Sequence, residues 1–198
     1  RSDFETQPSH EVLNAKLADF RTKLADVDVV VLSDYGKGGL THIAEMIKLA
    51  RAAGKPVLVD PKGDDYARYR GATVLTPNRS EFREVAGGWK NEAELSAKAE
   101  QLRTELQLEA LLVTRSEEGM SLYRANEVLH EPTQSREVFD VSGAGDTVIA
   151  TLAVMLACGE PWANAVRIAN RAAGIVVGKL GTAMVTRDEI VQDMKSDE

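Results

Sequence analysis

The chain has 198 residues, of which 43% are hydrophobic and 28% charged, an ordinary balance for a globular protein with one sizeable core. A net charge of −7 and a pI of about 5.1 argue against nonspecific nucleic-acid or membrane-surface binding, and no apolar run reaches the roughly 20 residues of a membrane span. One cysteine and three histidines exclude a disulfide framework and argue against a zinc site. We expect a cytoplasmic protein with no nucleic-acid or membrane partner, in which Cys158 is a small core residue.

The first part of the sequence alternates predicted helices with short apolar strands. Ser9 is a candidate N-cap for a helix whose apolar residues recur every three or four positions. Residues 28–33 form a continuous apolar run, typical of a strand that is buried on both faces of a parallel sheet. Thr41 is expected to cap a second helix, which stops at Gly54. A second strand is predicted over 56–60.

The same alternation continues toward the middle of the chain. The predicted elements are a short helical turn near 64–69, a strand at 73–75, helices at 79–86 and 92–106, and a strand at 110–114. Asn78 and Asn91 are the expected caps of the two helices. Glu81 stands at the third helical position after Asn78, which is the spacing of a capping box.

The pattern changes after Gly119. The predicted elements are strands at 120–123 and 128–130 with a turn at 125–126, and helices at 148–157, 161–179 and from 187 onward. The helix at 148–157 is apolar almost all round, which predicts burial. Pro161 and Thr186 are the expected starts of the last two helices. The alternation of strand and helix predicts a doubly wound, mostly parallel α/β sheet with helices on both faces, as a single domain over 1–198.

The glycine-rich stretch at 140–147 carries the strongest chemical signal. Gly143, Ala144 and Gly145 precede the apolar helix, so unpaired first-turn N–H groups and the positive end of the dipole form an anion site. Asp146 falls in the first turn, beside that site. A carboxylate there can orient an attacking hydroxyl and take its proton in phosphoryl transfer. The alternative is that Asp146 only complements the helix dipole.

Polar residues follow the ends of several predicted strands, where sheets of this kind bind ligands. Because these ends meet at one edge, we expect the side chains to converge on the glycine-rich turn. Four of them are candidates for contacts with phosphate or sugar, namely Asp34, Lys37, Asp60 and Lys62. Asp34 and Lys37 can equally pair with each other, and Lys62 can be a solvated loop lysine. Likewise, Asn78 and Glu81 can be only a capping box.

Three motifs resemble those of the ribokinase-like (PfkB-type) carbohydrate kinases. They are DVSGAGD at 140–146, NRSE at 78–81 and VTRSEEG at 113–119, in the order and spacing of that family. Longer strings, such as SDYGKG at 33–38 and DPKG at 60–63, are similar to the members that phosphorylate D-glycero-β-D-manno-heptose 7-phosphate at its anomeric hydroxyl. Those members serve ADP-heptose synthesis for the lipopolysaccharide core.

The resemblance implies roles for the matching residues. Asp146 would accept the proton of the anomeric hydroxyl, while Gly143, Ala144 and Gly145 form an anion hole. The residues implied to organise ATP and Mg²⁺, without a tight protein-only metal site, are Asn78, Arg79, Ser80, Glu81, Thr114, Ser116, Gly119 and Asn170. Asn170 can instead have a buried structural role. Asp140 and Ser142 would belong to a site for a monovalent cation such as K⁺.

The resemblance also implies what part of the enzyme this chain represents. Family members begin with a strand-rich half that carries sugar-binding residues and a lid, and bifunctional members continue into an adenylyltransferase domain. Nothing here corresponds to either, so we expect the C-terminal, nucleotide-binding part of a kinase domain from a homo-oligomeric parent. Two alternatives stay open: another kinase of the family, and a nucleotide-binding fragment without turnover. A Rossmann dehydrogenase is disfavoured because no G-x-G-x-x-G follows the first strand.

Overall fold

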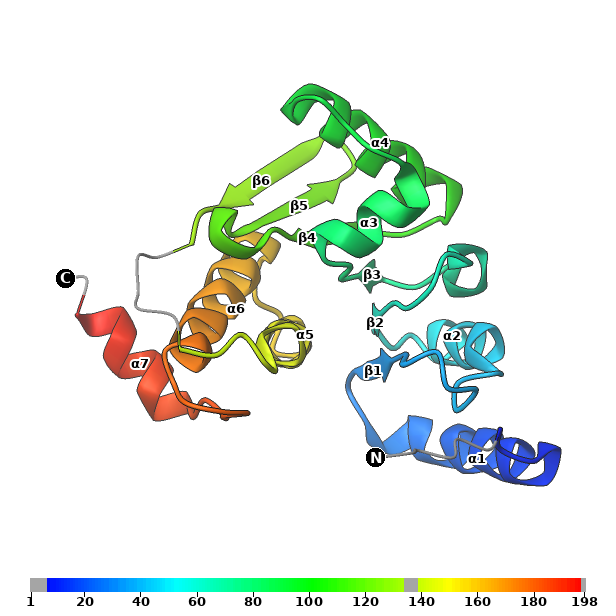
Figure 1. The fold of residues 1–198 in the computed structure, drawn as a ribbon. Coiled ribbons are helices and arrows are strands. Elements are labelled where there is room, and N and C mark those ends of the chain that lie inside the picture. The colour runs from blue at the N-terminus through cyan, green and yellow to red at the C-terminus, as the bar shows by residue number, and fades with distance from the viewer. Residues whose placement is uncertain (1–6, 134–138, 197–198) are drawn as a thin grey trace, which may run out of the picture.

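The computed structural model describes residues 7–133 and 139–196. In this part of the chain six strands form one sheet that lies between two layers of helices (Figure 1). The strands are β1 (Val30–Ser33), β2 (Val57–Asp60), β3 (Val74–Leu75), β4 (Ala110–Thr114), β5 (Met120–Arg124) and β6 (Glu127–Glu131). The helices are α1 (His10–Lys23), α2 (Ile43–Ala52), α3 (Arg79–Ala86), α4 (Glu92–Glu105), α5 (Ala144–Ala157), α6 (Trp162–Val177) and α7 (Arg187–Lys195). Short 3-10 helices lie at Leu24–Asp26, Tyr66–Tyr69 and Ser116–Glu118.

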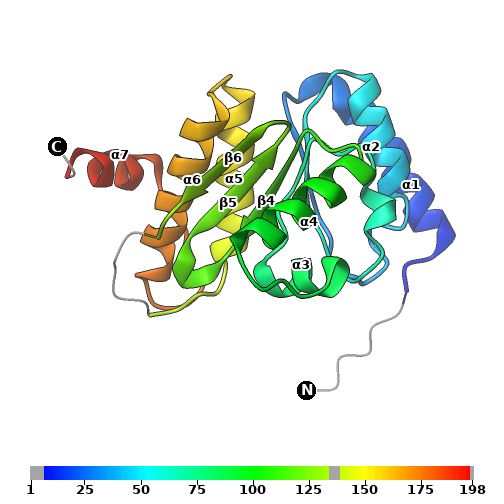
Figure 2. The same cartoon turned by 90° about the horizontal axis from the view of Figure 1, so that it is seen from above.

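The strands follow one another across the sheet in chain order. β1 to β4 are parallel, with Val30 opposite Val57 and Val74 opposite Ala110, whereas β4, β5 and β6 form an antiparallel meander. Helices α1 to α4 cover one face of the sheet, and α5 and α6 cover the other (Figure 2). The predicted doubly wound, mostly parallel sheet is therefore confirmed. Among the helices that the structure describes, none has both the length and the apolar character to cross a lipid bilayer.

A hydrophobic core fills the space on each side of the sheet. Ile43, Phe82 and Leu111 belong to the core beneath α1 to α4, whereas Leu112 and Ile149 belong to the core beneath α5 and α6. Leu111 and Leu112 are neighbours in β4 that point to opposite faces, as the two-residue period of a strand requires. Burial on both faces explains why the sequence of β4 is continuously apolar.

Most helices begin where the sequence predicts. The side chains that accept N–H groups of a first helical turn are those of Ser9, Asn78, Asn91 and Thr186. The predicted cap at Thr41 is wrong. Its hydroxyl donates instead to the carbonyl of Gly38 at 2.7 Å, within the preceding turn. Helix α2 begins at Ile43 without a side-chain cap.

Three predictions of burial are also wrong. Val31 in β1 is 41% exposed and Val154 in α5 is 54% exposed, although both stand in apolar runs. Cys158 follows α5 and is exposed. The reason is the place of each segment: β1 is the edge strand of the sheet, and α5 packs against α6, β1 and β2 through one face only. An apolar pattern indicates which residues can be buried. Whether a given residue is buried depends on which neighbouring elements cover it.

Candidate active site

A pocket of about 390 Å³ opens where the end of β4 meets the start of α5 and the middle of α6. The predicted site residues that line it are Thr114, Ser116, Gly119, Ala144, Gly145 and Asn170. Small or apolar side chains, including Val141, Val148 and Val177, make up much of the remaining wall. An apolar cleft with a few convergent polar groups is the usual form of a site for a planar organic ligand such as a nucleotide base.

The N-terminus of α5 provides an anion-binding end to this pocket. Gly143 is the N-cap, with a φ of +80° that favours glycine, and no side chain among the described residues caps the first turn. The N–H of Ala144 donates to the carbonyl of Val141 at 3.3 Å. Asp146 lies in the first turn and is exposed. The next two N–H groups, of Gly145 and Asp146, and the positive end of the helix dipole thus face an exposed surface that suits an anionic ligand, with the Asp146 carboxylate beside them.

Two residues of the preceding turn bond to each other. The N–H of Ser142 donates to Oδ1 of Asp140 at 2.8 Å. Hydrogen bonds from the backbone and side chain of Ser142 lower the pKa of Asp140, so this carboxylate is ionised at neutral pH. The turn is thereby ordered next to Gly143.

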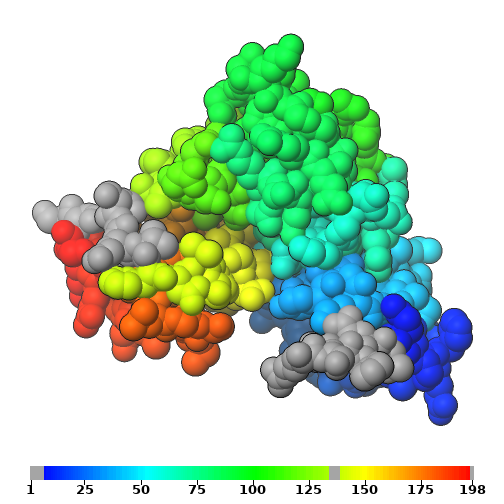
Figure 3. Space-filling view, in the orientation of Figure 1, coloured from blue at the N-terminus to red at the C-terminus, as the bar shows by residue number. Residues whose placement is uncertain are grey.

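Carboxylates and a lysine gather beside the start of α5, at the carboxyl ends of β1 and β2. In the space-filling view the start of α5, in yellow, borders the segments after β1 and β2, in blue and cyan (Figure 3). Lys62 Nζ lies 3.0 Å from Glu81 Oε1. The pKa of Asp60 is raised to about 6, mainly by burial and then by the charges of Glu81 and Asp146, while a hydrogen bond from Ser33 and the charge of Lys62 lower it. Glu81 and Asp146 therefore each lie within electrostatic reach of Asp60.

This acidic edge suits a hydrated cation rather than a fully protein-bound one. Within residues 7–133 and 139–196, no group of three His, Cys, Asp or Glu side chains is arranged to hold a metal ion. Mg²⁺ prefers oxygen ligands and commonly keeps several waters while it binds one or two carboxylates and substrate phosphates. The carboxylates of Asp60 and Glu81 match that chemistry.

The NRSE motif forms a complete capping box at the start of α3. Oδ1 of Asn78 accepts the N–H groups of Ser80 at 2.9 Å and Glu81 at 3.0 Å, and Glu81 Oε2 accepts the N–H of Asn78 at 3.0 Å. The structural role considered for this pair is therefore present. It leaves Oε1 of Glu81 on the side of Lys62, so the capping box and a role at the site are compatible. Ser80 is exposed on the first turn, and Arg79 pairs with Glu118.

Asp34 does not fit the predicted contact with phosphate or sugar. It is 5% exposed, and its carboxylate accepts the hydroxyl of Tyr69 at 2.8 Å and the N–H of Gly36 at 2.9 Å. The Tyr69 hydroxyl also accepts the N–H of Lys62 at 3.1 Å. Asp34 thus holds the Lys62 loop through Tyr69, while Lys37 is exposed in the loop after β1. This role of Tyr69 has no signal in the sequence, because nothing in a short helical turn marks an aromatic residue as the partner of a distant carboxylate.

Asn170 is a buried, hydrogen-bonded residue that also lines the pocket. It is 9% exposed, and its Nδ2 donates to the carbonyl of Pro132 at 2.8 Å. The same residue lines the pocket, next to Ala173 and Gly174 of α6. Its hydrogen bond fastens the chain after β6 to the pocket wall, so Asn170 shapes the pocket even before any ligand binds.

The motifs and their arrangement agree with one family of sugar kinases. A profile of the pfkB family carbohydrate kinases matches residues 4–188. This chain belongs to that family. The resemblance inferred from the motifs at 78–81 and 140–146 is confirmed, and membership of a carbohydrate kinase family implies the use of ATP.

The relatives of this pfkB-family chain include a heptose 7-phosphate kinase and a bifunctional protein. It is 56% identical over 190 residues to the D-beta-D-heptose 7-phosphate kinase of Bordetella bronchiseptica. The aligned region makes up 96% of this chain and 61% of the relative. It is 54% identical over 197 residues to the bifunctional protein HldE of Shewanella amazonensis. Here the aligned region makes up 99% of this chain and 41% of the relative. The chain therefore spans less than two thirds of the length of either relative.

Solved ribokinases share the fold of this pfkB-family chain. The Arabidopsis thaliana ribokinase complexed with ribose and ATP matches with a TM-score of 0.80 at 23% identity, over 89% of this chain and 59% of that one. The ribokinase of Thermotoga maritima matches with a TM-score of 0.76 at 25% identity, over 92% of this chain and 61% of that one. The predicted ribokinase-like α/β fold is confirmed.

The raised pKa of Asp60 predicts that Asp60→Asn stabilises the fold at neutral pH. Because the pKa rises from 3.8 to about 6 on folding, ionised Asp60 costs stability above pH 6, and this cost disappears as the pH falls toward 3.8. After allowance for solvent screening, we expect Asp60→Asn to raise the free energy of unfolding by about 1–2 kcal/mol at pH 7.5. Urea unfolding across this pH range measures it. Asp64→Asn, in an exposed position of the same loop, is the control, and a gain that does not change with pH would contradict the assignment.

Proposed function

We propose that this chain carries the nucleotide side of an ATP-dependent kinase that phosphorylates D-glycero-β-D-manno-heptose 7-phosphate at its anomeric hydroxyl, giving the 1,7-bisphosphate for ADP-heptose synthesis. The observation that carries the proposal is the uncapped N-terminus of α5, where Gly145 lines the pocket and Asp146 lies within electrostatic reach of Asp60. The choice of acceptor rests on the name of the relative that is 56% identical, a D-beta-D-heptose 7-phosphate kinase.

In the proposed reaction the sugar hydroxyl oxygen forms a bond to the γ-phosphorus of ATP. The bond from that phosphorus to the oxygen bridging to the β-phosphate breaks, and ADP leaves. The hydroxyl proton passes to the carboxylate of Asp146, while the N–H groups of Gly145 and its neighbours stabilise charge on the transferring group. A carboxylate is a weak base toward an alcohol, so proton transfer comes late and positioning supplies most of the rate.

The proposal assigns further roles to the remaining predicted residues. Asp60, Glu81 and Asn78 would hold Mg²⁺ through water, and the ion would neutralise charge on the phosphates when bound. Asp140 and Ser142 would hold a monovalent cation such as K⁺. The proposed enzyme is a cytoplasmic homo-oligomer whose ligands are ATP and a phosphorylated sugar.

A turnover assay on the full-length protein tests the proposed function. The protein is supplied with ATP, Mg²⁺ and one sugar at a time, and ADP release and the phosphorylated product are measured. Preferential turnover of heptose 7-phosphate supports the proposal. Faster turnover of ribose or fructose 6-phosphate would show that the proposed acceptor is wrong and would favour another kinase of the family. Nucleotide binding without turnover of any sugar would favour a binding fragment.

Glu81→Gln is expected to raise the Mg²⁺ concentration needed for half-maximal activity by about tenfold, as loss of a carboxylate near a metal commonly does. The amide oxygen of Gln can still accept the N–H of Asn78, so the capping box is kept. A Mg²⁺ titration of the initial rate measures the effect. Glu84→Gln, an exposed acid of the same helix, is the matched control. Identical titrations for the two variants would refute a role of Glu81 in holding the metal.

A further inference from the structure

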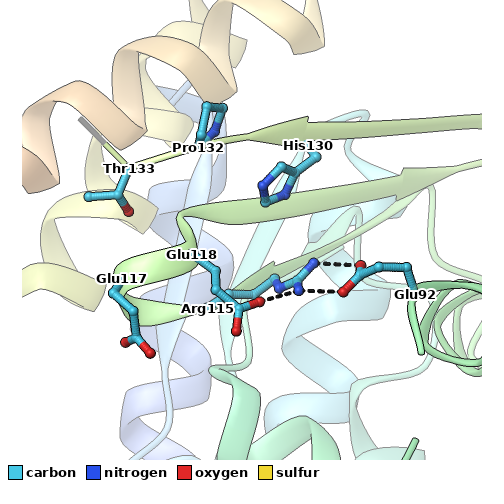
Figure 4. A pocket seen from close by; sticks show the side chains of 7 residues that line it. All are labelled: Glu92, Arg115, Glu117, Glu118, His130, Pro132 and Thr133. Atoms are coloured by element: carbon cyan, nitrogen blue, oxygen red, sulfur yellow. Dashed lines mark hydrogen bonds and ion pairs between the residues drawn. The ribbon is translucent and has the colours of Figure 1, made fainter. Parts of the chain in front are cut away.

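A buried arginine lies directly behind the pocket wall formed by the loop between β4 and β5. Arg115 is 5% exposed, and its guanidinium donates to both oxygens of Glu92, at 2.8 and 2.6 Å. It also pairs with Glu118 (Figure 4). In addition, it donates to Ser121 Oγ at 3.1 Å. The partner carboxylates lie nearer to solvent, with side chains that are 69% exposed for Glu92 and 37% exposed for Glu118. A forked contact of this kind fixes the orientation of the guanidinium as well as its position.

The loop held by this arginine has an unfavourable backbone conformation. Ser116 has a φ of +53° and Gly119 a φ of +88°, and residues with a Cβ rarely adopt such values. The N–H of Arg115 donates to the carbonyl of Gly119 at 2.8 Å, and Thr133 Oγ1 donates to the carbonyl of Ser116 at 3.0 Å. A strained loop keeps its conformation only when the surrounding contacts determine it. Here that conformation places Ser116 and Gly119 in the wall of the nucleotide pocket.

The same contacts join the loop to the start of α3. Glu118 pairs with Arg115 and also with Arg79, the first residue of that helix. Arg79 stands next to Asn78, whose capping box with Glu81 faces Lys62. The guanidinium of Arg79 lies 5.9 Å from the ring centroid of Trp89, which fixes it further. Glu118 therefore lies between two arginines that belong to the two sides of the site.

We propose that Arg115 is a positioning residue for the nucleotide, an inference that rests on the proposed function. Through Glu92 it anchors the loop to the first turn of α4, and through Glu118 and Arg79 it fixes the distance from that loop to the start of α3. The loop, and Ser116 with it, is therefore already in the conformation that contacts the nucleotide before the nucleotide binds. The guanidinium of Arg115 donates to both oxygens of Glu92 and to Glu118 at the same time. A lysine cannot fully replace it, because a single ammonium group cannot make all of these contacts in one fixed geometry.

Arg103 offers a matched control within the same chain. Its guanidinium makes a similar forked contact with Glu100, at 2.5 and 2.8 Å, and donates to the carbonyl of Leu108 at 2.9 Å. Leu108 precedes β4, so this second arginine lies at the end of the strand opposite to the pocket. Substitution of Arg103 removes a comparable ion pair far from the pocket. It therefore measures how much the loss of such an ion pair alone changes nucleotide affinity.

The test compares Arg115→Met, Arg115→Lys and Arg103→Met by calorimetric titration with a nonhydrolysable ATP analogue and by hydrogen exchange of the amides at 115–119. We expect Arg115→Met to raise the dissociation constant about tenfold, the equivalent of one lost positioned hydrogen bond. Arg115→Lys should show a smaller rise, and Arg103→Met none. Exchange at 115–119 should accelerate in the Arg115 variants alone. Equal affinities and equal exchange in Arg115→Met and Arg103→Met would overturn the inference.

Two further outcomes separate this inference from the proposed function. If Arg115→Met does not fold, Glu118→Gln keeps the arginine and removes only the charge between the two sides of the site, with the same readouts. If the unchanged chain does not bind the analogue, the proposed function fails. Faster exchange at 115–119 in the Arg115 variants would then still assign the loop contact, and unchanged exchange would reject both.

Discussion

Asp146→Asn is expected to lower kcat of the full-length enzyme by about 10²–10⁴-fold, the contribution of a positioned general base. The amide cannot accept the hydroxyl proton, but it has nearly the same shape in the first turn of α5, where Asp146 is exposed. The dissociation constant of an ATP analogue should therefore change little. Steady-state turnover together with calorimetric titration measures both quantities.

Asp188→Asn controls for the helix-dipole effect of this substitution. Asp188 is an exposed acid in the first turn of α7, so its loss removes a similar dipole interaction, worth about 0.3–1 kcal/mol, away from the pocket. It should leave kcat unchanged. Equal turnover in Asp146→Asn and the unchanged enzyme would show that Asp146 only complements the dipole.

Gly119→Ala is expected to destabilise the fold by about 3 kcal/mol or more, because it combines backbone strain with a clash. The added Cβ would lie 2.1 Å from the carbonyl oxygen of Glu131 and 2.7 Å from the backbone nitrogen of Thr133. Both are backbone atoms, so neither can move aside as a flexible side chain would. Relief requires the β4–β5 loop to shift, which also moves Ser116 out of the pocket wall. Urea unfolding and nucleotide titration measure the two effects.

Gly63→Ala separates strain from clash. Gly63 has a φ of +78°, close to that of Gly119, but within the described part of the chain no atom lies within 4 Å of its added Cβ. We expect this variant to lose only about 1 kcal/mol, the cost of the backbone conformation alone. If both alanine variants lost the same free energy, the close approach to Glu131 would have no energetic importance.

The convergence of the site was predictable because it follows from topology. Parallel strands end at one edge, so polar residues after β2, β3 and β4 had to lie near one another. The ion pair of Lys62, after β2, with Glu81, after β3, agrees with that expectation. The pocket adds Thr114, from the end of β4, beside Gly145. The capping box of Asn78 and Glu81 was predictable for a local reason, since both partners lie within one helical turn.

Partnerships between distant residues could not be predicted from the sequence. Asp34 was expected at the surface of the site, but Tyr69 lies 35 positions away and takes its carboxylate into the interior. Arg115 stood inside a motif whose polar residues were assigned to the nucleotide, while its guanidinium is turned away to Glu92. Local patterns show that a group is polar; only the packed fold determines which acceptor reaches it.

The exposure of apolar residues has a similar explanation. Val31 and Val154 carry the same sequence signal as buried residues nearby, and they differ only in the neighbours that the fold provides. Within the described residues β1 pairs with β2 alone, and α5 packs against β1, β2 and α6. Hydrophobic periodicity therefore predicted the elements correctly and the extent of their burial incorrectly.

Calorimetric titration of this chain with a nonhydrolysable ATP analogue, with and without Mg²⁺, tests the central claim most directly. The claim is that the pocket between β4, α5 and α6 binds a nucleotide whose phosphates lie at the N-terminus of α5. We predict saturable binding that strengthens when Mg²⁺ is added, and that Gly145→Asp, which places a second carboxylate at the anion site, abolishes. Absence of binding by the folded chain in both conditions, or binding unaffected by Gly145→Asp, would contradict it.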